Sequence, residues 1–221
     1  MTRIFAPEVV SDVGAGHGEC PTWNPADRSL VWVDISAGQI HRFDPSTGAD
    51  EAVSVGSQLG SVAPRSSGGL VLAIEEGFAV LDSFAGEPRL VAAIDHGPGP
   101  VTRMNDGKCD SQGRFWAGSM AYDCAPGHAA LYRLDPDLRV SKVLGGITIS
   151  NGLDWSDDGR TLFTSIRLLA SRSGTSSTGL FDRASTPLTS TLSPRHCPAD
   201  TACSTFQPSK VCPRAWPSPT A

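Results

Sequence analysis

One tight turn recurs along this chain at intervals of 45 and 46 residues. Its copies are Ser-Ser-Gly-Gly-Leu-Val-Leu-Ala around Gly68, Asp-Ser-Gln-Gly-Arg-Phe-Trp-Ala-Gly around Gly113, and Ser-Asp-Asp-Gly-Arg-Thr-Leu-Phe around Gly159. A related turn at Asp27 precedes them by a similar interval. A polar turn followed by an alternating apolar run is typical of a β-hairpin. Recurrence every 40–50 residues or so is typical of a β-propeller, with one four-stranded sheet per repeat.

The segments that follow these turns have the period of two that strands require, and almost nothing in the chain has a helical period. We therefore predict an all-β protein built mainly of antiparallel strands. The expected strands are residues 30–35, 39–43, 70–74, 78–81, 115–120 and 130–134.

Composition and charge exclude several classes of protein. A net charge of −5 gives no indication of a nucleic-acid partner. No apolar run approaches the roughly 20 residues needed to cross a bilayer, and the first residues lack the core of a signal peptide. We expect a cytoplasmic protein with no membrane partner, and nothing indicates an oligomer. The six cysteines are scattered without a Cys-x-x-Cys or zinc spacing, so free thiols are expected.

The texture of the sequence changes after Phe163. The 59 residues from 163 onward contain 11 Ser, 9 Thr and 7 Pro but no Glu or Tyr. Prolines remove donors from a sheet, and there is little clustered apolar surface to offset the entropy of ordering. We therefore divide the chain into a partial propeller (1–163) and an aberrant tail (164–221). The tail is either a disordered segment or the product of a shifted reading frame.

Three ordered motifs resemble the gluconolactonase–regucalcin family, also called the senescence-marker-protein family, of six-bladed β-propeller lactonases. The first is Gly16-His17-Gly18-Glu19-Cys20-Pro21-Thr22-Trp23 with the strand at 30–35. The second is Arg103-Met104-Asn105-Asp106-Gly107-Lys108 with Gly113-Arg114-Phe115-Trp116-Ala117-Gly118. The third is Ile149-Ser150-Asn151-Gly152-Leu153-Asp154-Trp155-Ser156. The resemblance covers the first half of a complete member and implies a propeller truncated to about three to four blades.

The resemblance implies one divalent metal ion, Ca, Zn, Mg or Mn, bound by Glu19 and Asn151. Both side chains offer hard oxygen donors, which suit these cations. The residues alone leave alternatives open, since Glu19 could be a solvated loop residue and Asn151 a turn residue. Asp106 and Asp154 are further candidates: family members place the equivalent of Asp106 near the metal through water, and Asp154 more readily fixes its turn.

The resemblance also implies that Arg103 and Asn105 bind the substrate. The two residues alternate along one strand, so their side chains point the same way, and together they can hold the carbonyl and hydroxyl groups of a sugar lactone. The alternative is a surface ion pair of Arg103 with Asp106 or Asp110. A third substrate contact of the family, a Glu, falls at Asp123, which is one methylene shorter. His17, Lys108 and His128 have no assigned role.

The family's general base is an Asp in a Pro-Asp-Gly-x-x-x-Asp motif that this sequence lacks, so no catalytic residue is assigned. Three hypotheses follow: a metal-dependent lactonase that opens a sugar lactone to the aldonic acid, a calcium-binding regulator of the regucalcin kind, or an inactive truncated product. Metal-dependent turnover of gluconolactone or xylonolactone distinguishes the first from the second.

Overall fold

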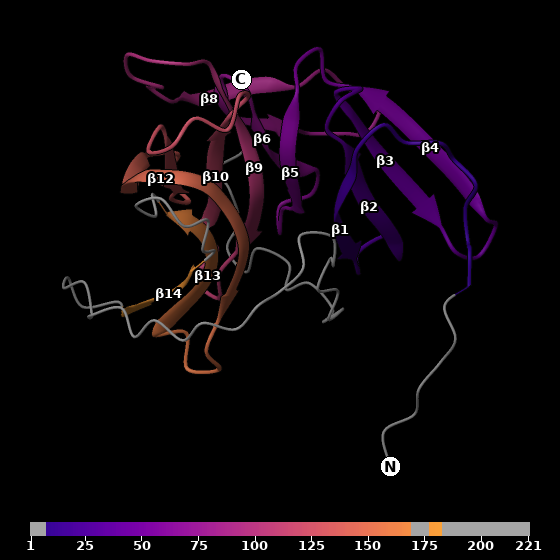
Figure 1. The fold of residues 1–221 in the computed structure, drawn as a ribbon. Helices are drawn as coiled ribbons and strands as arrows, with labels where there is room; N and C mark the ends of the chain where they lie inside the picture. The colour runs from indigo at the N-terminus through magenta and orange to yellow at the C-terminus, as the bar shows by residue number, and fades with distance from the viewer. Residues whose placement is uncertain (1–7, 169–176, 183–221) are drawn as a thin grey trace.

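The computed structural model describes residues 8–168 and 177–182, and all of its regular elements in these ranges are β-strands. The strands form three antiparallel sheets that follow one another around an arc (Figure 1). The prediction of an all-β protein with antiparallel strands is confirmed.

The first two sheets are simple four-stranded meanders. The first contains β1 (Gly18–Asn24), β2 (Ser29–Asp34), β3 (Gln39–Asp44) and β4 (Ala49–Ser54). The second contains β5 (Leu59–Pro64), β6 (Leu70–Ile74), β7 (Gly77–Leu81) and β8 (Arg89–Ala93). Consecutive strands are neighbours in both sheets, as a propeller blade requires.

The third sheet has six strands because one long strand joins two blades. Its members are β9 (Thr102–Cys109), β10 (Phe115–Ala121), β11 (Ala129–Leu134), β12 (Val140–Trp155), β13 (Thr161–Leu168) and β14 (Ser177–Asp182). The first half of β12 pairs with β11 as the outer strand of the third blade. Its second half pairs with β13 as the inner strand of a fourth. Gly146, which has a positive φ of 72°, lies where the strand changes partner.

The repeated turns have the geometry that their glycines predict. Gly68, Gly113 and Gly159 have φ values of 89°, 77° and 65°, a region that glycine adopts without steric cost. Each donates its N–H to the carbonyl oxygen three residues earlier, at 3.1, 3.1 and 2.8 Å. Each turn connects the inner strand of a blade to its second strand, so the repeat in the sequence is the repeat of the blades.

The first strand of each blade lies against the first strand of the next. β1 contacts β5, β5 contacts β9, and β9 contacts β12. These strands therefore surround the inner side of the arc, and residues far apart in the sequence meet there. This arrangement positions the candidate site.

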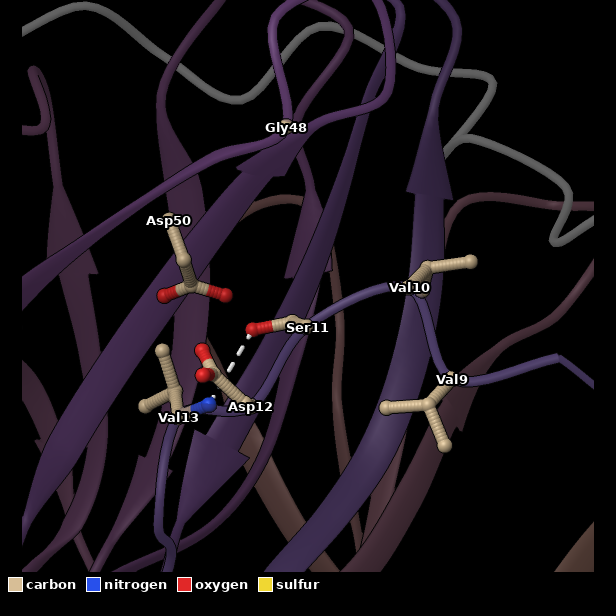
Figure 2. Close-up of a pocket in the computed structure, with 7 residues that line it drawn as sticks. All are labelled: Val9, Val10, Ser11, Asp12, Val13, Gly48 and Asp50. Carbon is tan, nitrogen blue, oxygen red and sulfur yellow. Dashed lines mark hydrogen bonds between the residues drawn. The ribbon is translucent and has the colours of Figure 1, made fainter.

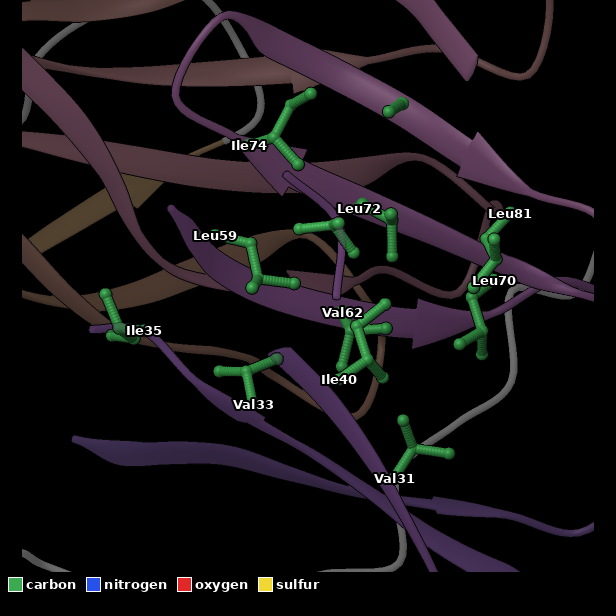
Figure 3. Packing of buried hydrophobic residues seen from close by; sticks show 12 residues of the cluster. Val31, Val33, Ile35, Ile40, Leu59, Val62, Leu70, Leu72, Ile74 and Leu81 are labelled. Atoms are coloured by element: carbon green, nitrogen blue, oxygen red, sulfur yellow. The ribbon is translucent and has the colours of Figure 1, made fainter. Parts of the chain in front are cut away.

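Apolar side chains between the blades hold the arc together. Between the first and second sheets, Val33 and Ile40 from one side meet Leu59, Leu72 and Ile74 from the other (Figure 3). Leu59, Leu72 and Ile40 are fully buried. Replacing a buried leucine of this kind by alanine typically costs about 2–5 kcal/mol.

The predicted boundary between the two regions of the chain and the predicted free cysteines can both be compared with the fold. The predicted boundary at residue 163 falls inside β13, and β14 also lies beyond it, while 169–176 and 183–221 lie outside the described residues. Cys20 and Cys124 are free thiols as predicted, but Cys109 is disulfide-bonded, so the prediction is wrong for that residue. The spacing of cysteines in a sequence does not by itself reveal whether a given thiol is oxidised. Cys197, Cys203 and Cys212 lie outside the described residues.

Within the described ranges, no helix is long and apolar enough to span a membrane.

Candidate functional site

A cavity of about 240 Å³ lies among the inner strands of the blades. It is lined by residues from the segment before β1, from five of the strands and from the turn after β2: His17, Glu19, Ile35, Gly60, Arg103, Asn105, Asp106, Met120, Ile149 and Asn151. Four of the five residues predicted for the site, Glu19, Arg103, Asn105 and Asn151, therefore share one cavity. Their functional roles remain predictions.

A larger hollow of about 320 Å³ lies elsewhere, between residues 9–13 and the first sheet (Figure 2). Its lining includes the exposed Val9, Val10 and Asp12 and the carboxylate of Asp50. The Asp50 carboxylate is already bound by His41 at 2.7 Å and by the indole N–H of Trp32 at 3.0 Å. Because none of the five residues predicted for the site lines this hollow, we assign the candidate site to the smaller cavity.

Arg103 and Asn105 form one hydrogen-bonded unit on β9. The Nη1 of Arg103 donates to Asn105 Oδ1 at 3.0 Å and to the carbonyl oxygen of Met104 at 3.0 Å. The Nδ2 of Asn105 donates to the carbonyl oxygen of Ser150 on β12 at 2.7 Å. Both side chains are at least nine-tenths buried. The amide of Asn105 therefore links the guanidinium to the neighbouring inner strand.

The alternative of a surface ion pair for Arg103 is wrong. The Asp110 carboxylate instead accepts hydrogen bonds from Arg114, from the indole of Trp116 and from two backbone N–H groups. Among the described residues, Arg103 forms no ion pair with a carboxylate. Burial lowers the pKa of its guanidinium, and the nearby Tyr122, Cys124 and Glu19 oppose this shift. The group nevertheless stays charged in any ordinary buffer.

Asp106 joins the second and third motifs. Its Oδ1 accepts from its neighbour Gly107 N at 2.9 Å, and its Oδ2 accepts from Gly152 N, 46 residues away, at 2.9 Å. Burial raises the pKa of the Asp106 carboxyl above its ordinary value; the two N–H donors oppose this, and the negative charge of Glu19 adds to it. The negative charge of Glu19 therefore acts on the carboxyl group of Asp106, which lines the same cavity.

Glu19 and Asn151 present oxygen atoms with few competing partners. The side chain of Glu19 is 58% exposed, and His17 Nε2 lies 3.8 Å from its Oε1. Asn151 is exposed, and its Oδ1 accepts from the N–H of Gly152 at 3.1 Å. Oxygens of this kind remain available to a cation or a ligand.

The strand that carries Glu19 is anchored by Asp34. The buried carboxylate of Asp34 accepts from the N–H groups of Gly16 at 2.8 Å, His17 at 3.1 Å and Ala37 at 3.2 Å. Desolvation acts to raise the pKa of Asp34, but the hydrogen bonds from these backbone groups outweigh it and leave the pKa below its ordinary value. Asp34 therefore fixes the turn that leads into β1.

Two predicted candidates lie away from the cavity lining. Asp123 follows β10, where its Oδ1 accepts from Ala125 N at 2.9 Å. Asp154 accepts from its neighbour Trp155 N at 2.9 Å and pairs with Lys108 Nζ at 3.2 Å. Asp154 lies within β12 opposite Phe163, so its role in fixing the turn stays a prediction.

Sequence reasoning missed Gly60, Ile35, Met120 and Ile149 in the lining. Gly60 is needed because a Cβ at this position would lie 2.3 Å from the carbonyl oxygen of Asn105. Ile35 and the half-buried Met120 and Ile149 make one part of the cavity apolar. Ile35 and Ile149 belong to the first and third motifs and Met120 follows the second, but no motif assigned these apolar residues to the lining.

The oxygen atoms that line this cavity suit a hard divalent cation. Two carboxylates, Glu19 and Asp106, and the amide oxygen of Asn151 line the same space. Burial is the main cause of the raised pKa of Asp106, and a cation there would relieve the smaller contribution from the negative charge of Glu19. Within the described ranges, no cluster of three or more His, Cys, Asp or Glu has the geometry of a metal site. The described residues thus fit a cation held by few protein ligands.

The family description "SMP-30/Gluconolactonase/LRE-like region" matches residues 17–176, which is most of the chain. The match begins at the turn before β1 and includes every residue that lines the cavity.

Curated relatives match over the same part. Regucalcin of Xenopus laevis is 41% identical over 151 residues, which are 66% of this chain and 50% of that relative. The 6-deoxy-6-sulfogluconolactonase of Pseudomonas putida is 35% identical over 141 residues, 64% of this chain and 48% of that enzyme. The chain spans about half the length of the curated relatives it matches.

Solved structures have the same fold. A luciferin-regenerating enzyme superposes with a TM-score of 0.67 at 26% identity, covering 76% of this chain and 56% of that one. A regucalcin of Agrobacterium tumefaciens, described as a calcium-binding protein, superposes with a TM-score of 0.68 at 24% identity, covering 80% and 62%. At 24% identity, the similarity to the regucalcin structure is evidence for the fold alone.

Proposed function

Since the chain belongs to the SMP-30/gluconolactonase/LRE-like family, we propose that its central cavity is the site of a metal-dependent lactonase, which hydrolyses a sugar lactone to the aldonic acid. One observation carries the proposal: Glu19, Arg103, Asn105 and Asn151 come from three separate strands and line the same cavity. Such convergence of polar groups in a partly apolar cavity is typical of a small-molecule site.

In this proposal Arg103 holds the substrate through the N–H groups that Asn105 and Met104 do not use. A guanidinium donates to carbonyl and hydroxyl oxygens with a fixed geometry. Its burial removes competing water and strengthens each such hydrogen bond. Asn105 keeps the guanidinium oriented, since its Oδ1 accepts from Arg103 while its Nδ2 is fixed to Ser150. The apolar Ile35, Met120 and Ile149 would pack against the ring carbons of the lactone.

Glu19 and Asn151 would hold the divalent cation, with Asp106 close enough to interact with it through water. When bound, such a cation polarises a lactone carbonyl and stabilises the negative charge that forms on its oxygen. Asp106 keeps Gly152 in place through its hydrogen bond to the Gly152 N–H, and so positions Asn151 beside it. Asp123 stays a proposed third substrate contact, one that would require the loop after β10 to move toward the cavity.

No described residue is assigned as the base that takes a proton from the attacking water. Glu19 is the proposed metal ligand, and both oxygens of Asp106 accept backbone N–H groups. The activity of this chain by itself is therefore the part of the proposal that most needs measurement.

The test is the initial rate of gluconolactone and xylonolactone hydrolysis by the purified chain after dialysis against EDTA, followed by addition of Ca²⁺, Zn²⁺, Mg²⁺ or Mn²⁺. We expect loss of hydrolysis on chelation and its recovery with at least one of these ions. Hydrolysis that EDTA leaves unchanged would contradict the metal-dependent proposal.

A second candidate is calcium binding without turnover. The similarity to the regucalcin relatives favours it. It requires the same oxygen donors, Glu19 and Asn151, but no base. Stoichiometric binding of Ca²⁺ together with no hydrolysis under any metal condition would select this candidate, and absence of both activities would select the inactive product.

A further inference from the structure

Arg103 is a buried cation on which the negative charge of Glu19 acts, but it forms no ion pair with a carboxylate among the described residues. Within the described part of the chain, its hydrogen bonds go to two neutral acceptors, the carbonyl oxygen of Met104 and the amide oxygen of Asn105. A buried charge without a partner is costly and attracts any carboxylate within reach. Something must therefore keep the nearby carboxylates away from it.

Tyr122 stands next to Arg103 on the same face of the sheet. Met120 pairs directly with Arg103 across β10 and β9, and Tyr122 is two residues beyond Met120, so Tyr122 and Arg103 are diagonal neighbours. The N–H of Tyr122 donates to Val101 at 3.1 Å, which continues the pairing past the end of the strand. The positive charge of Arg103 acts on the Tyr122 phenol, so the two groups are close.

The phenol of Tyr122 is committed to a carboxylate of the adjacent blade. Its hydroxyl donates to Glu75 Oε2 at 2.7 Å, between residues 47 positions apart in the chain. Glu75 follows β6 at the turn to β7, and the next carboxylate, Glu76, accepts from the hydroxyl of Ser57 at 2.9 Å. Both acidic side chains of this turn are thus held by hydroxyl donors. The Tyr122 phenol thus has Glu75 as its hydrogen-bond partner and Arg103 as its diagonal neighbour in the sheet.

The hydroxyl proton of Tyr122, which forms the hydrogen bond to Glu75, is present at every ordinary pH. Burial, the hydrogen bond to Glu75 and the charge of Glu75 raise the pKa of Tyr122 to about 12, against the opposing effect of Arg103. The phenol therefore keeps its proton and goes on donating to Glu75 throughout the neutral range.

Resting on the proposed function, we propose that Tyr122 is a positioning residue that holds the Glu75 carboxylate away from Arg103 and so leaves the guanidinium open to the lactone or the aldonate. Without the phenol, Glu75 is free to pair with Arg103 and to compete with the ligand for the same N–H groups. The hydrogen bond between Tyr122 and Glu75, which joins two blades, therefore raises the affinity of Arg103 for the ligand.

The experiment compares the wild-type chain with Tyr122→Phe, Glu75→Gln and the double variant, with gluconate as the binding probe in isothermal titration calorimetry. KM and kcat for gluconolactone are measured in parallel. We expect Tyr122→Phe to weaken gluconate binding and to raise KM by roughly three- to tenfold, with kcat within about twofold. Glu75→Gln should stay within about twofold of the wild type, and the double variant should recover the wild-type affinity because the competing charge is gone.

Tyr132→Phe is the matched control, since it removes the other phenol, whose contact to the carbonyl of Asp95 is a long 3.5 Å and lies away from the cavity. It should leave binding unchanged. A Tyr122→Phe variant that binds like the wild type, or a double variant as weak as Tyr122→Phe, would overturn the inference. Gluconate binding with the expected pattern but no hydrolysis would overturn the proposed function alone. Absence of both binding and hydrolysis in the wild type would overturn both.

Discussion

The guanidinium of Arg103 donates to the amide oxygen of Asn105 at 3.0 Å, two residues further along β9. The same amide donates to the carbonyl oxygen of Ser150 on β12, so a chain of hydrogen bonds connects two inner strands across the cavity. The arrangement fixes the direction of the guanidinium before any ligand arrives. Binding then requires little reorganisation of the site.

The first prediction concerns the planar shape of the Arg103 guanidinium. Arg103→Lys keeps the charge but cannot donate to Asn105 and to a ligand with the same fixed geometry. We expect a loss of about 1.5–3 kcal/mol, or roughly 10- to 100-fold in kcat/KM for gluconolactone. Arg139→Lys is the control, since Arg139 is exposed and binds only Asp137 beside it. Equal activity of the two variants would show that charge alone matters at Arg103.

The second prediction concerns acid stability. The folded-state pKa of Asp34 lies below its ordinary value of 3.8, so the ionised carboxylate stabilises the fold above that pH, and this contribution is lost as the pH falls through the lower folded-state value. Asp34→Asn should lower the free energy of unfolding at pH 7 by about 1–3 kcal/mol, because Asn cannot accept all three N–H groups. The variant should also lose less stability than the wild type below about pH 4.

Urea titrations at several pH values measure both effects. Asp137→Asn is the matched control, because Asp137 also has a lowered pKa but is exposed and paired with the exposed Arg139. A wild-type pH profile that Asp34→Asn does not alter would refute the anchoring role of Asp34.

The third prediction concerns the contact between blades at the site. Gly60→Ala would place a Cβ 2.3 Å from the carbonyl oxygen of Asn105 and 2.4 Å from the carbonyl carbon of Met104. Both are backbone atoms and cannot move aside without shifting β9. We expect destabilisation of about 1–3 kcal/mol or more, measured by urea unfolding. Gly14→Ala, with no atom within 4 Å of the added methyl, should unfold like the wild type.

Much of the fold could be predicted from the sequence because the turns and the strands are determined by residues that are close together in the chain. The turn glycines at Gly68, Gly113 and Gly159 set the repeat, and each has the positive φ that its turn requires. The alternation that follows each turn predicted the second and third strands to within a residue or two. The sharing of β12 by two blades could not be predicted, since it depends on which neighbour each half of the strand pairs with.

The site was predictable only where a motif carried it. Glu19, Arg103, Asn105 and Asn151 each lie in a motif of the family, and the order of the blades brings them to one cavity. Asp34, Gly60 and the tether between Tyr122 and Glu75 depend on contacts between distant segments, which leave no local signal. Asp123 was placed by position in a motif alone, and its side chain turns instead to its own loop.

The most direct test of the account is the affinity of the chain for Mn²⁺, measured by electron paramagnetic resonance of the free ion, in the wild type and in the variants Glu19→Gln and Asn151→Ala. We predict one Mn²⁺ per chain, bound at least roughly tenfold more weakly by each variant, because each loses one of few oxygen ligands. Glu51→Gln removes an exposed carboxylate on β4 that pairs with Arg42 and is not part of the cavity lining, so this variant should bind Mn²⁺ like the wild type. Equal Mn²⁺ affinity in the wild type and both cavity variants would contradict a cation held by Glu19 and Asn151.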